Sequence, residues 1–310
     1  MSLTLNWIDR NITVDKFRIY RATTPILDGA VPAFLAEVAS GVFTYTDSTA
    51  VRNQLYHYRV GAVQGDDETL SANMPLAYMP YTGPGPQKLL RGDWSLGTFG
   101  RMNAEDLFAP SELCTLVNYP AITVAPVATV ATTWIKMVYN GKILFVPDRS
   151  ISQALSVWGW ADLYKAGLVY GTDDQSTWSA AAKSTYGVIP QAFTITKAEH
   201  SFIMRLPGTR VGALAGSAVP ANQIGGEYDF IMSPNYQGRA QTFGGPTLDD
   251  LIHASVNENA YTKDVTATDG ATCILRGPNG GATPDSVLTT TLASVSAVWG
   301  YWRPVLELVL

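Results

Sequence analysis

Three histidines and several neighbouring carboxylates are the residues of this chain best suited to proton transfer or metal binding. Asp249, Asp250 and His253 share one face of a helix expected at 247–256, where they could form an acid–base pair or ligate a metal. The same pattern is typical of an acidic first turn on a solvated helix. We favour this second interpretation, because nothing else in the sequence supports a catalytic centre there.

The other candidate groups lack a supporting pattern. His57 and His200 share no motif, and His57 lies in an expected strand, where ordinary packing explains it. The pairs Glu105–Asp106 and Asp173–Asp174 could serve glycoside hydrolysis only at a suitable separation, which the sequence does not set. Hydrolase, zinc-protease, P-loop and calcium-loop motifs do not occur. The sequence therefore predicts no enzyme activity, no cofactor and no metal.

Aromatic residues offer a different chemistry, the stacking of sugar rings. Trp158, Trp160 and Trp178 stand near polar segments and are possible glycan contacts, although such residues are more typical of a core or an interface. Glycine-rich stretches at 238–247 and 276–286 predict exposed loops, where recognition residues commonly lie.

The elements that would position these residues are mainly strands. Alternating apolar residues with turn residues every 8–12 positions predict a small sandwich over residues 1–80. A segment rich in proline and glycine, 81–93, predicts a semi-rigid linker. The pattern of apolar and turn residues over 94–310 predicts a larger β-rich domain with short helices.

Local signals within the larger domain are of unequal strength. Asn140–Gly141 lies between two apolar runs, which predicts a hairpin with a type I′ turn. The run "WADLYKAG" predicts a two-turn helix ended by Gly167. We also expect a helix that starts at Asn103 or Ala104 and is stopped by Pro110, and a second one from Ser111. Strands are expected within 192–208, 271–282 and 296–309, and a short helix within 225–235.

Composition limits the classes of partner. Only 15% of the residues are charged and the net charge is −5, with no basic cluster, so nucleic-acid binding is not expected. Cys114 and Cys273 form no metal or redox spacing, and we expect two buried thiols rather than a bridge. A signal segment and a run of 18 apolar residues are both absent, which predicts synthesis in a cytoplasm and no membrane insertion.

The front segment resembles a fibronectin type III module. The similarity rests on "IYRATTP" and "TYTDSTAVRNQLYHYRVGAV", with Trp7 at the place of the tryptophan on strand B and Tyr56 at that of the tyrosine before strand F. The usual first strand has no counterpart, so Leu3–Ile8 would form a sheet edge. Either a neighbouring subunit or a later segment adds a strand there, or water forms hydrogen bonds with the unpaired N–H and C=O groups of the edge.

The rest of the chain is similar to structural proteins of tailed-bacteriophage virions. The shared order of motifs is "FGRMNAEDLFAPSEL", "WIKMVYNGKILFVPDRSIS", "WADLYKAGLVYG", "FIMRLPG", "GGEYDFIM", "LRGPNGG" and "WRPVLEL". A weaker likeness is to the C-type-lectin-like folds of phage tropism proteins. The resemblance implies a virion location and a tail, tail-fibre, baseplate, neck or capsid-decoration role.

The apolar ending "VWGYWRPVLELVL" fits this picture. At a period of two, both faces of the segment are largely apolar, which predicts a strand covered on both sides. Its charged residues, Arg303 and Glu307, would pair with neighbours or across an interface. As interface candidates we name the residues of this ending and of the front edge: Leu3, Leu5, Trp7, Trp299, Tyr301, Trp302, Arg303 and Glu307.

Together these observations predict a non-enzymatic component of a phage particle that assembles through aromatic-rich interfaces. We expect a homo-oligomer, as a ring or trimer, together with contacts to other virion proteins. The alternative is a receptor-binding adhesin that attaches to a glycan on the host surface. A polysaccharide-degrading enzyme is a third and weaker hypothesis.

Overall fold

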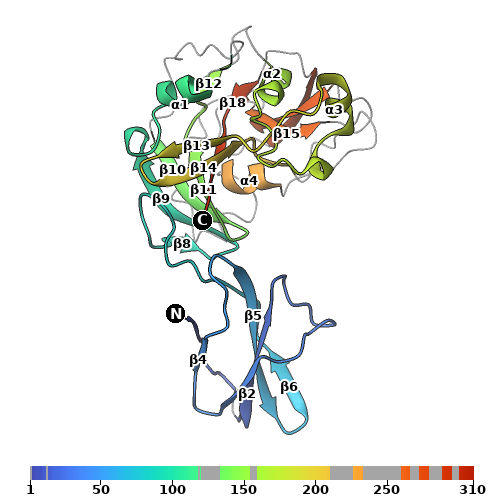
Figure 1. The fold of residues 1–310 in the computed structure, drawn as a ribbon. Helices are drawn as coiled ribbons and strands as arrows, with labels where there is room; N and C mark the ends of the chain where they lie inside the picture. The colour runs from blue at the N-terminus through green and yellow to red at the C-terminus, as the bar shows by residue number, and fades with distance from the viewer. Residues whose placement is uncertain are drawn as a thin grey trace. The chain divides into compact units, whose positions relative to one another are not determined.

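The computed structural model describes residues 2–11, 13–117, 119, 133–153, 159–209, 226–232, 260–265, 272–278, 288–294 and 300–310. The chain is mainly β, as predicted, and its strands form several largely antiparallel sheets (Figure 1). It divides into two compact units. Unit 1 comprises Met1–Thr82, Asp93–Leu96 and Leu310, and unit 2 comprises Gly83–Gly92 and Gly97–Val309.

Unit 1 is built from two sheets in a sandwich-like arrangement. The smaller sheet pairs β1 (Leu3–Asn6) with β4 (Thr44–Asp47). The larger sheet has the order β3-β2-β5-β6, with β7 also paired to β5. Its strands are β2 (Lys16–Ala22), β3 (Ala36–Ala39), β5 (Leu55–Gln64), β6 (Asp67–Leu70) and β7 (Met74–Ala77).

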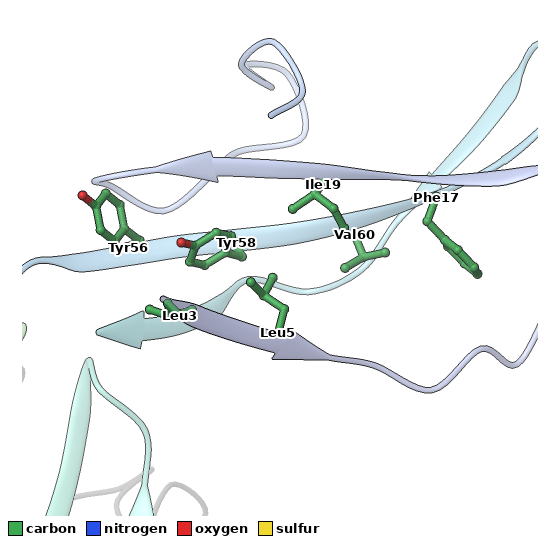
Figure 2. Packing of buried hydrophobic residues seen from close by; sticks show 7 residues of the cluster. All are labelled: Leu3, Leu5, Phe17, Ile19, Tyr56, Tyr58 and Val60. Atoms are coloured by element: carbon green, nitrogen blue, oxygen red, sulfur yellow. The ribbon is translucent and has the colours of Figure 1, made fainter. Parts of the chain in front are cut away.

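The core of unit 1 follows from the alternation in these strands. Leu3 and Leu5 point from β1 toward the apolar side chains of β2 and β5, among them Ile19, Tyr58 and Val60 (Figure 2). The exposed residues of β1 alternate with these two, as a strand with one buried face requires. Apolar residues at every second position therefore hold the two sheets together.

Unit 2 contains a seven-stranded sheet with the order β13-β14-β19-β11-β10-β9-β8 and a five-stranded sheet with the order β12-β18-β15-β16-β17. The seven-stranded sheet consists of β8 (Arg91–Gly92), β9 (Leu96–Asn103), β10 (Thr133–Tyr139), β11 (Lys142–Pro147), β13 (Thr194–Lys197), β14 (His200–Arg205) and β19 (Val305–Leu308). The five-stranded sheet consists of β12 (Ser152–Gln153), β15 (Ala260–Val265), β16 (Thr272–Pro278), β17 (Leu288–Ser294) and β18 (Tyr301–Trp302).

The described helices are short. They are α1 (Pro110–Val117), α2 (Trp160–Lys165), α3 (Ala180–Tyr186) and α4 (Glu227–Met232), with 3₁₀ turns at η1 (Ala104–Asp106) and η2 (Gln175–Thr177). The predictions of α2 and α4 are confirmed, and Gly167 follows α2 with a φ of 77°. The expected helix at 247–256 lies outside the described residues.

The predicted hairpin is confirmed. β10 and β11 pair with Tyr139 opposite Lys142. The two turn residues between them, Asn140 and Gly141, have φ values of 48° and 74°. Positive φ at both central positions defines a type I′ turn, which asparagine and glycine tolerate best. The local sequence is therefore sufficient to set this register.

The helix predicted before Pro110 is wrong in length. Only the single 3₁₀ turn η1 forms there, closed by the Leu107 amide that donates to Ala104 O, and Pro110 begins α1 instead of ending a helix. Proline has no amide hydrogen, so it fits the first turn of a helix, where that donor has no helical acceptor. The indole of Trp134 donates to Phe108 O, and this bond holds the residues between η1 and α1 in place.

The ending predicted as one central strand forms two strands instead, β18 in the five-stranded sheet and β19 in the seven-stranded sheet, separated by Arg303 and Pro304. The prediction of a central position holds for β19. β19 lies between β14 and β11 and is antiparallel to both. Val305, Leu306 and Leu308 are buried. Residues Val305–Leu308 thus form an interior strand of the seven-stranded sheet, while Val309 and Leu310 are exposed.

The segment expected as a linker is tied into unit 2 over part of its length. Residues Gly83–Gly92 belong to that unit. The buried ammonium of Lys136, on β10, donates to Gly83 O at 3.3 Å and to Pro86 O at 2.6 Å. A buried lysine needs such acceptors, because an unpartnered charge is costly away from water.

Candidate functional site

An open cavity of about 450 Å³ lies on unit 2. Its wall includes the β10–β11 turn, residues of β11, β14, β15 and β19, the first residue of α4, and the segment 170–172. A volume of this size is in the ordinary range of small-ligand sites. We take this cavity as the candidate recognition site of the chain.

A charged network forms the base of the cavity. Arg205, at the end of β14, donates to both carboxylate oxygens of Glu227 at 2.7 and 2.6 Å, and its Nε donates to Glu307 at 3.0 Å. Glu227 is the first residue of α4 and Glu307 lies on β19. The bidentate contact between Arg205 and Glu227 fixes the orientation of both side chains. The network therefore joins a helix and two strands beneath the cavity.

The ionisation of the network is well defined. Burial alone would raise the pKa of Glu227, but the charge and hydrogen bonds of Arg205 outweigh it and lower that pKa. Burial alone would lower the pKa of Arg205. The attraction of Glu227 and Glu307 outweighs this effect, so the pKa of Arg205 is raised. Arg205 and Glu227 are thus charged together. Glu307 also accepts from Lys142 at 2.7 Å.

Two glycines make room for the basic side chains. A Cβ at Gly171 would lie 2.6 Å from the side chain of Arg205, and a Cβ at Gly208 would lie 2.7 Å from that of Lys263. Real side chains do not approach so closely, so both positions require glycine while these cations lie where they do. Gly208 also donates its amide to Glu227.

Lys263 and Asp264 are neighbours on β15, next to Thr209. Asp264 accepts from the amide and the hydroxyl of Thr209. Burial raises the pKa of Asp264, against the effect of these two donors. The Lys263 charge lowers the pKa of both Asp264 and Glu227, yet within the described part of the chain Lys263 forms no ion pair.

Hydroxyl groups complete the wall. The Thr172 hydroxyl accepts from the Asp174 amide, and the Tyr170 hydroxyl accepts from the Ser179 amide. Each oxygen therefore already uses an acceptor site, while no acceptor among the described residues takes its own hydrogen, which a ligand could receive. Tyr139 and Asn140 lie at the β10–β11 turn, where Tyr139 stacks on Phe230 with ring centroids 6.0 Å apart.

Of the interface candidates, only Glu307 lies in this cavity. Arg303 is buried elsewhere and donates to Pro147 O and Asp148 O, so both charged residues of the ending pair with neighbours. Trp302 is buried and Tyr301 is partly exposed on β18. Leu3 and Leu5 belong to the core of unit 1, with Trp7 packed against it. Trp299 lies outside the described residues.

Two of the proposed glycan contacts, Trp160 and Trp178, do not offer a sugar-stacking surface. Trp160 and Trp178 are buried in an aromatic cluster with Tyr164 and Tyr170, and the Trp160 indole donates to Thr262 O. Their rings are covered by protein, because apolar packing is worth more than exposure of two large rings. Trp158 lies outside the described residues.

The remaining chemical candidates are structural where they are described. His57 is buried in β5, and burial lowers its pKa against the opposing charge of Asp93. His200 packs edge-on against Phe202. Asp173 accepts from two backbone amides and Asp174 caps η2, while Glu105 and Asp106 belong to the single turn η1. Asp249, Asp250 and His253 lie outside the described residues.

Within the described residues, neither Cys114 nor Cys273 forms a disulfide, and Cys273 is fully buried while Cys114 is half-buried. No group of three His, Cys, Asp or Glu side chains in the described ranges is placed to hold a metal ion. Within those ranges, no helix is both long and apolar enough to cross a membrane.

A second surface of interest lies on unit 1. The Trp7 amide donates to Phe43 O, which brings the end of β1 beside the residues before β4. Ile8 is 81% exposed, and Val42 and Phe43 are each 42% exposed. Together Trp7, Ile8, Val42 and Phe43 form what we call the apolar edge patch. The sequence pattern indicated this edge but not Val42 and Phe43. Of the cavity residues, only Glu307 was among the predicted contacts.

Comparisons of the chain with protein-family models, with curated proteins and with solved structures found no match.

Proposed function

We propose that this protein is a non-enzymatic structural component of a tailed-phage particle. It would be made in the host cytoplasm and would act in the virion as part of a tail, baseplate, neck or capsid appendage. Unit 1 would be a fibronectin type III-like module and unit 2 a β-rich virion domain related to C-type-lectin-like folds. The order of motifs in residues 94–310, the low charge and the abundance of aromatic residues support the proposal.

The apolar edge patch is the observation that carries the assembly role. Ile8, Val42 and Phe43 expose apolar surface beside a strand that, among the described residues, pairs only with β4. Apolar residues grouped at a sheet edge commonly mark a surface that another chain covers. The partner would be a second copy of this chain, in a ring or trimer, or another virion protein.

Sedimentation of the full chain tests this role. We expect an oligomer at micromolar concentration, and Ile8→Ser combined with Phe43→Ser should weaken association about tenfold or more, because each loses the burial of a large apolar side chain. Val188→Ser is the matched control, since Val188 is an exposed apolar residue of unit 2. A chain that stays monomeric, or a double variant that associates like the parent, would contradict the proposal.

Recognition of a host-surface glycan is a second candidate function, and the cavity of unit 2 is the observation that favours it. The cavity is open and offers hydroxyl and charged groups in fixed positions. Binding of the full chain to members of a glycan array would support this function. Absence of binding to any glycan on the array would contradict it.

A further inference from the structure

The charged groups of the cavity on unit 2 are unequally satisfied. Each oxygen of Glu227 and Glu307 already accepts a hydrogen bond from Arg205 or Lys142. The cation that, within the described ranges, has no ion pair is Lys263. A positively charged ligand would therefore meet carboxylates that are already neutralised, while a negatively charged ligand would meet an available ammonium group.

We infer that the cavity binds an acidic saccharide, with Lys263 as the residue that recognises its carboxylate. The inference rests on the proposed glycan recognition and specifies its site and ligand class. An ammonium group that is free to turn in a partly enclosed site forms strong, charge-assisted hydrogen bonds to a carboxylate. Arg205 does not serve this role, because Glu227 and Glu307 occupy all of its described contacts apart from the Leu206 carbonyl.

The uncharged groups of the wall point to the same ligand. The hydroxyls of Thr172 and Tyr170 each accept a hydrogen bond from the backbone, and within the described ranges neither donates its own hydrogen. The available groups are thus donors, and they suit a molecule rich in acceptor oxygens. A cavity of about 450 Å³ is far larger than an inorganic anion and has room for a sugar ring with its substituents.

The position of Lys263 is set by the backbone beneath it. Its side chain crosses Gly208, where a Cβ would lie 2.7 Å from Cε. The Gly208 amide is itself fixed by its bond to Glu227. The network thus holds the segment after β14 that Lys263 crosses, while Lys263 itself remains outside the network.

A matched pair of ligands tests the inference on the full chain. Methyl glucuronide and methyl glucoside differ only in the carboxylate, and their affinities can be compared by calorimetric titration or ligand-observed NMR. We expect the glucuronide to bind about tenfold or more tightly, the effect of one charge-assisted hydrogen bond. N-acetylneuraminic acid, titrated in parallel, shows which acidic sugar fits better. Equal affinity for the glucuronide and the glucoside would overturn the inference.

A variant identifies the residue. Lys263→Gln should reduce glucuronide affinity to that of the glucoside, while Lys88→Gln, which changes an exposed lysine of unit 2 outside the cavity, should leave the preference intact. A glucuronide preference that survives in Lys263→Gln would also overturn the inference. Array binding to neutral glycans, unchanged in this variant, would leave glycan recognition standing and remove the acidic-sugar site. Absence of any saccharide binding would remove both.

Discussion

At the residue scale, Lys136 is a group strongly perturbed by its surroundings. It is fully buried on β10, donates to two backbone carbonyls, and lies 5.0 Å from the ring centroid of Phe99. Burial lowers its pKa from 10.5 to about 7. The lysine therefore gives up its proton in the folded protein at a pH where the unfolded chain keeps it.

This difference predicts a pH dependence of stability. Between pH 7 and 9 the unfolded state binds more protons at Lys136 than the folded state, so the free energy of unfolding should rise with pH. The rise should be lost in Lys136→Met and kept in Lys88→Met, which changes an exposed lysine. Denaturant titrations at several pH values measure the effect. A Lys136→Met protein with the parent slope would contradict the prediction.

At the element scale, Asp47 connects the two sheets of unit 1. It is fully buried at the end of β4 and accepts hydrogen bonds from Arg21 on β2, from the Tyr58 hydroxyl on β5, and from Thr49. Burial alone would raise the pKa of Asp47, but these donors outweigh it and lower the pKa. One carboxylate thus ties β4 to both central strands of the larger sheet.

We expect Asp47→Asn to destabilise unit 1 by about 2 to 3 kcal/mol, less than a fully buried ion pair because Arg21 is partly exposed. Asp66→Asn, in the exposed turn before β6, is the control. The stabilisation from Asp47 is present above its unfolded pKa and is lost as the pH falls through the lower folded value. Thermal unfolding of the two variants at neutral and acidic pH measures both effects. A cost no larger than that of Asp66→Asn would show that the carboxylate does not hold the sheets together.

Elements with a local physical cause could be predicted from sequence. Asn140 and Gly141 tolerate positive φ, so the hairpin and its register follow from two residues. The two apolar faces of the ending likewise predict a central strand, and residues 305–308 form one. Pro110 shows the limit, because proline fits both the end of one helix and the start of the next, and contacts distant in sequence decided between them.

At the scale of the whole molecule, the candidate cavity could not be predicted. Its residues come from Tyr139 through Glu307, on strands whose order in the sheet differs from their order in the chain. No spacing rule links Arg205 with Glu227 and Glu307. Trp160 and Trp178 have the right chemistry for sugar stacking, yet the fold uses both in its core. Residue type alone does not show which aromatic side chains reach the surface.

The apolar edge patch and the cavity lie on different units and imply different contacts. The patch of unit 1 offers apolar surface to another protein, whereas the cavity of unit 2 offers polar groups to a small ligand. In the proposed particle, one unit would serve assembly and the other attachment. Loss of association through the apolar edge patch should then leave ligand binding in the cavity intact, and the reverse should also hold.

The most direct test of the particle role is quantitative mass spectrometry of purified virions from a phage that encodes this chain. Our account predicts that the protein is present in a fixed copy number that matches a symmetric ring or trimer, and that low-resolution imaging places it on a tail, neck, baseplate or capsid appendage. Absence of the protein from mature particles, with the chain found only in the infected-cell lysate, would contradict it.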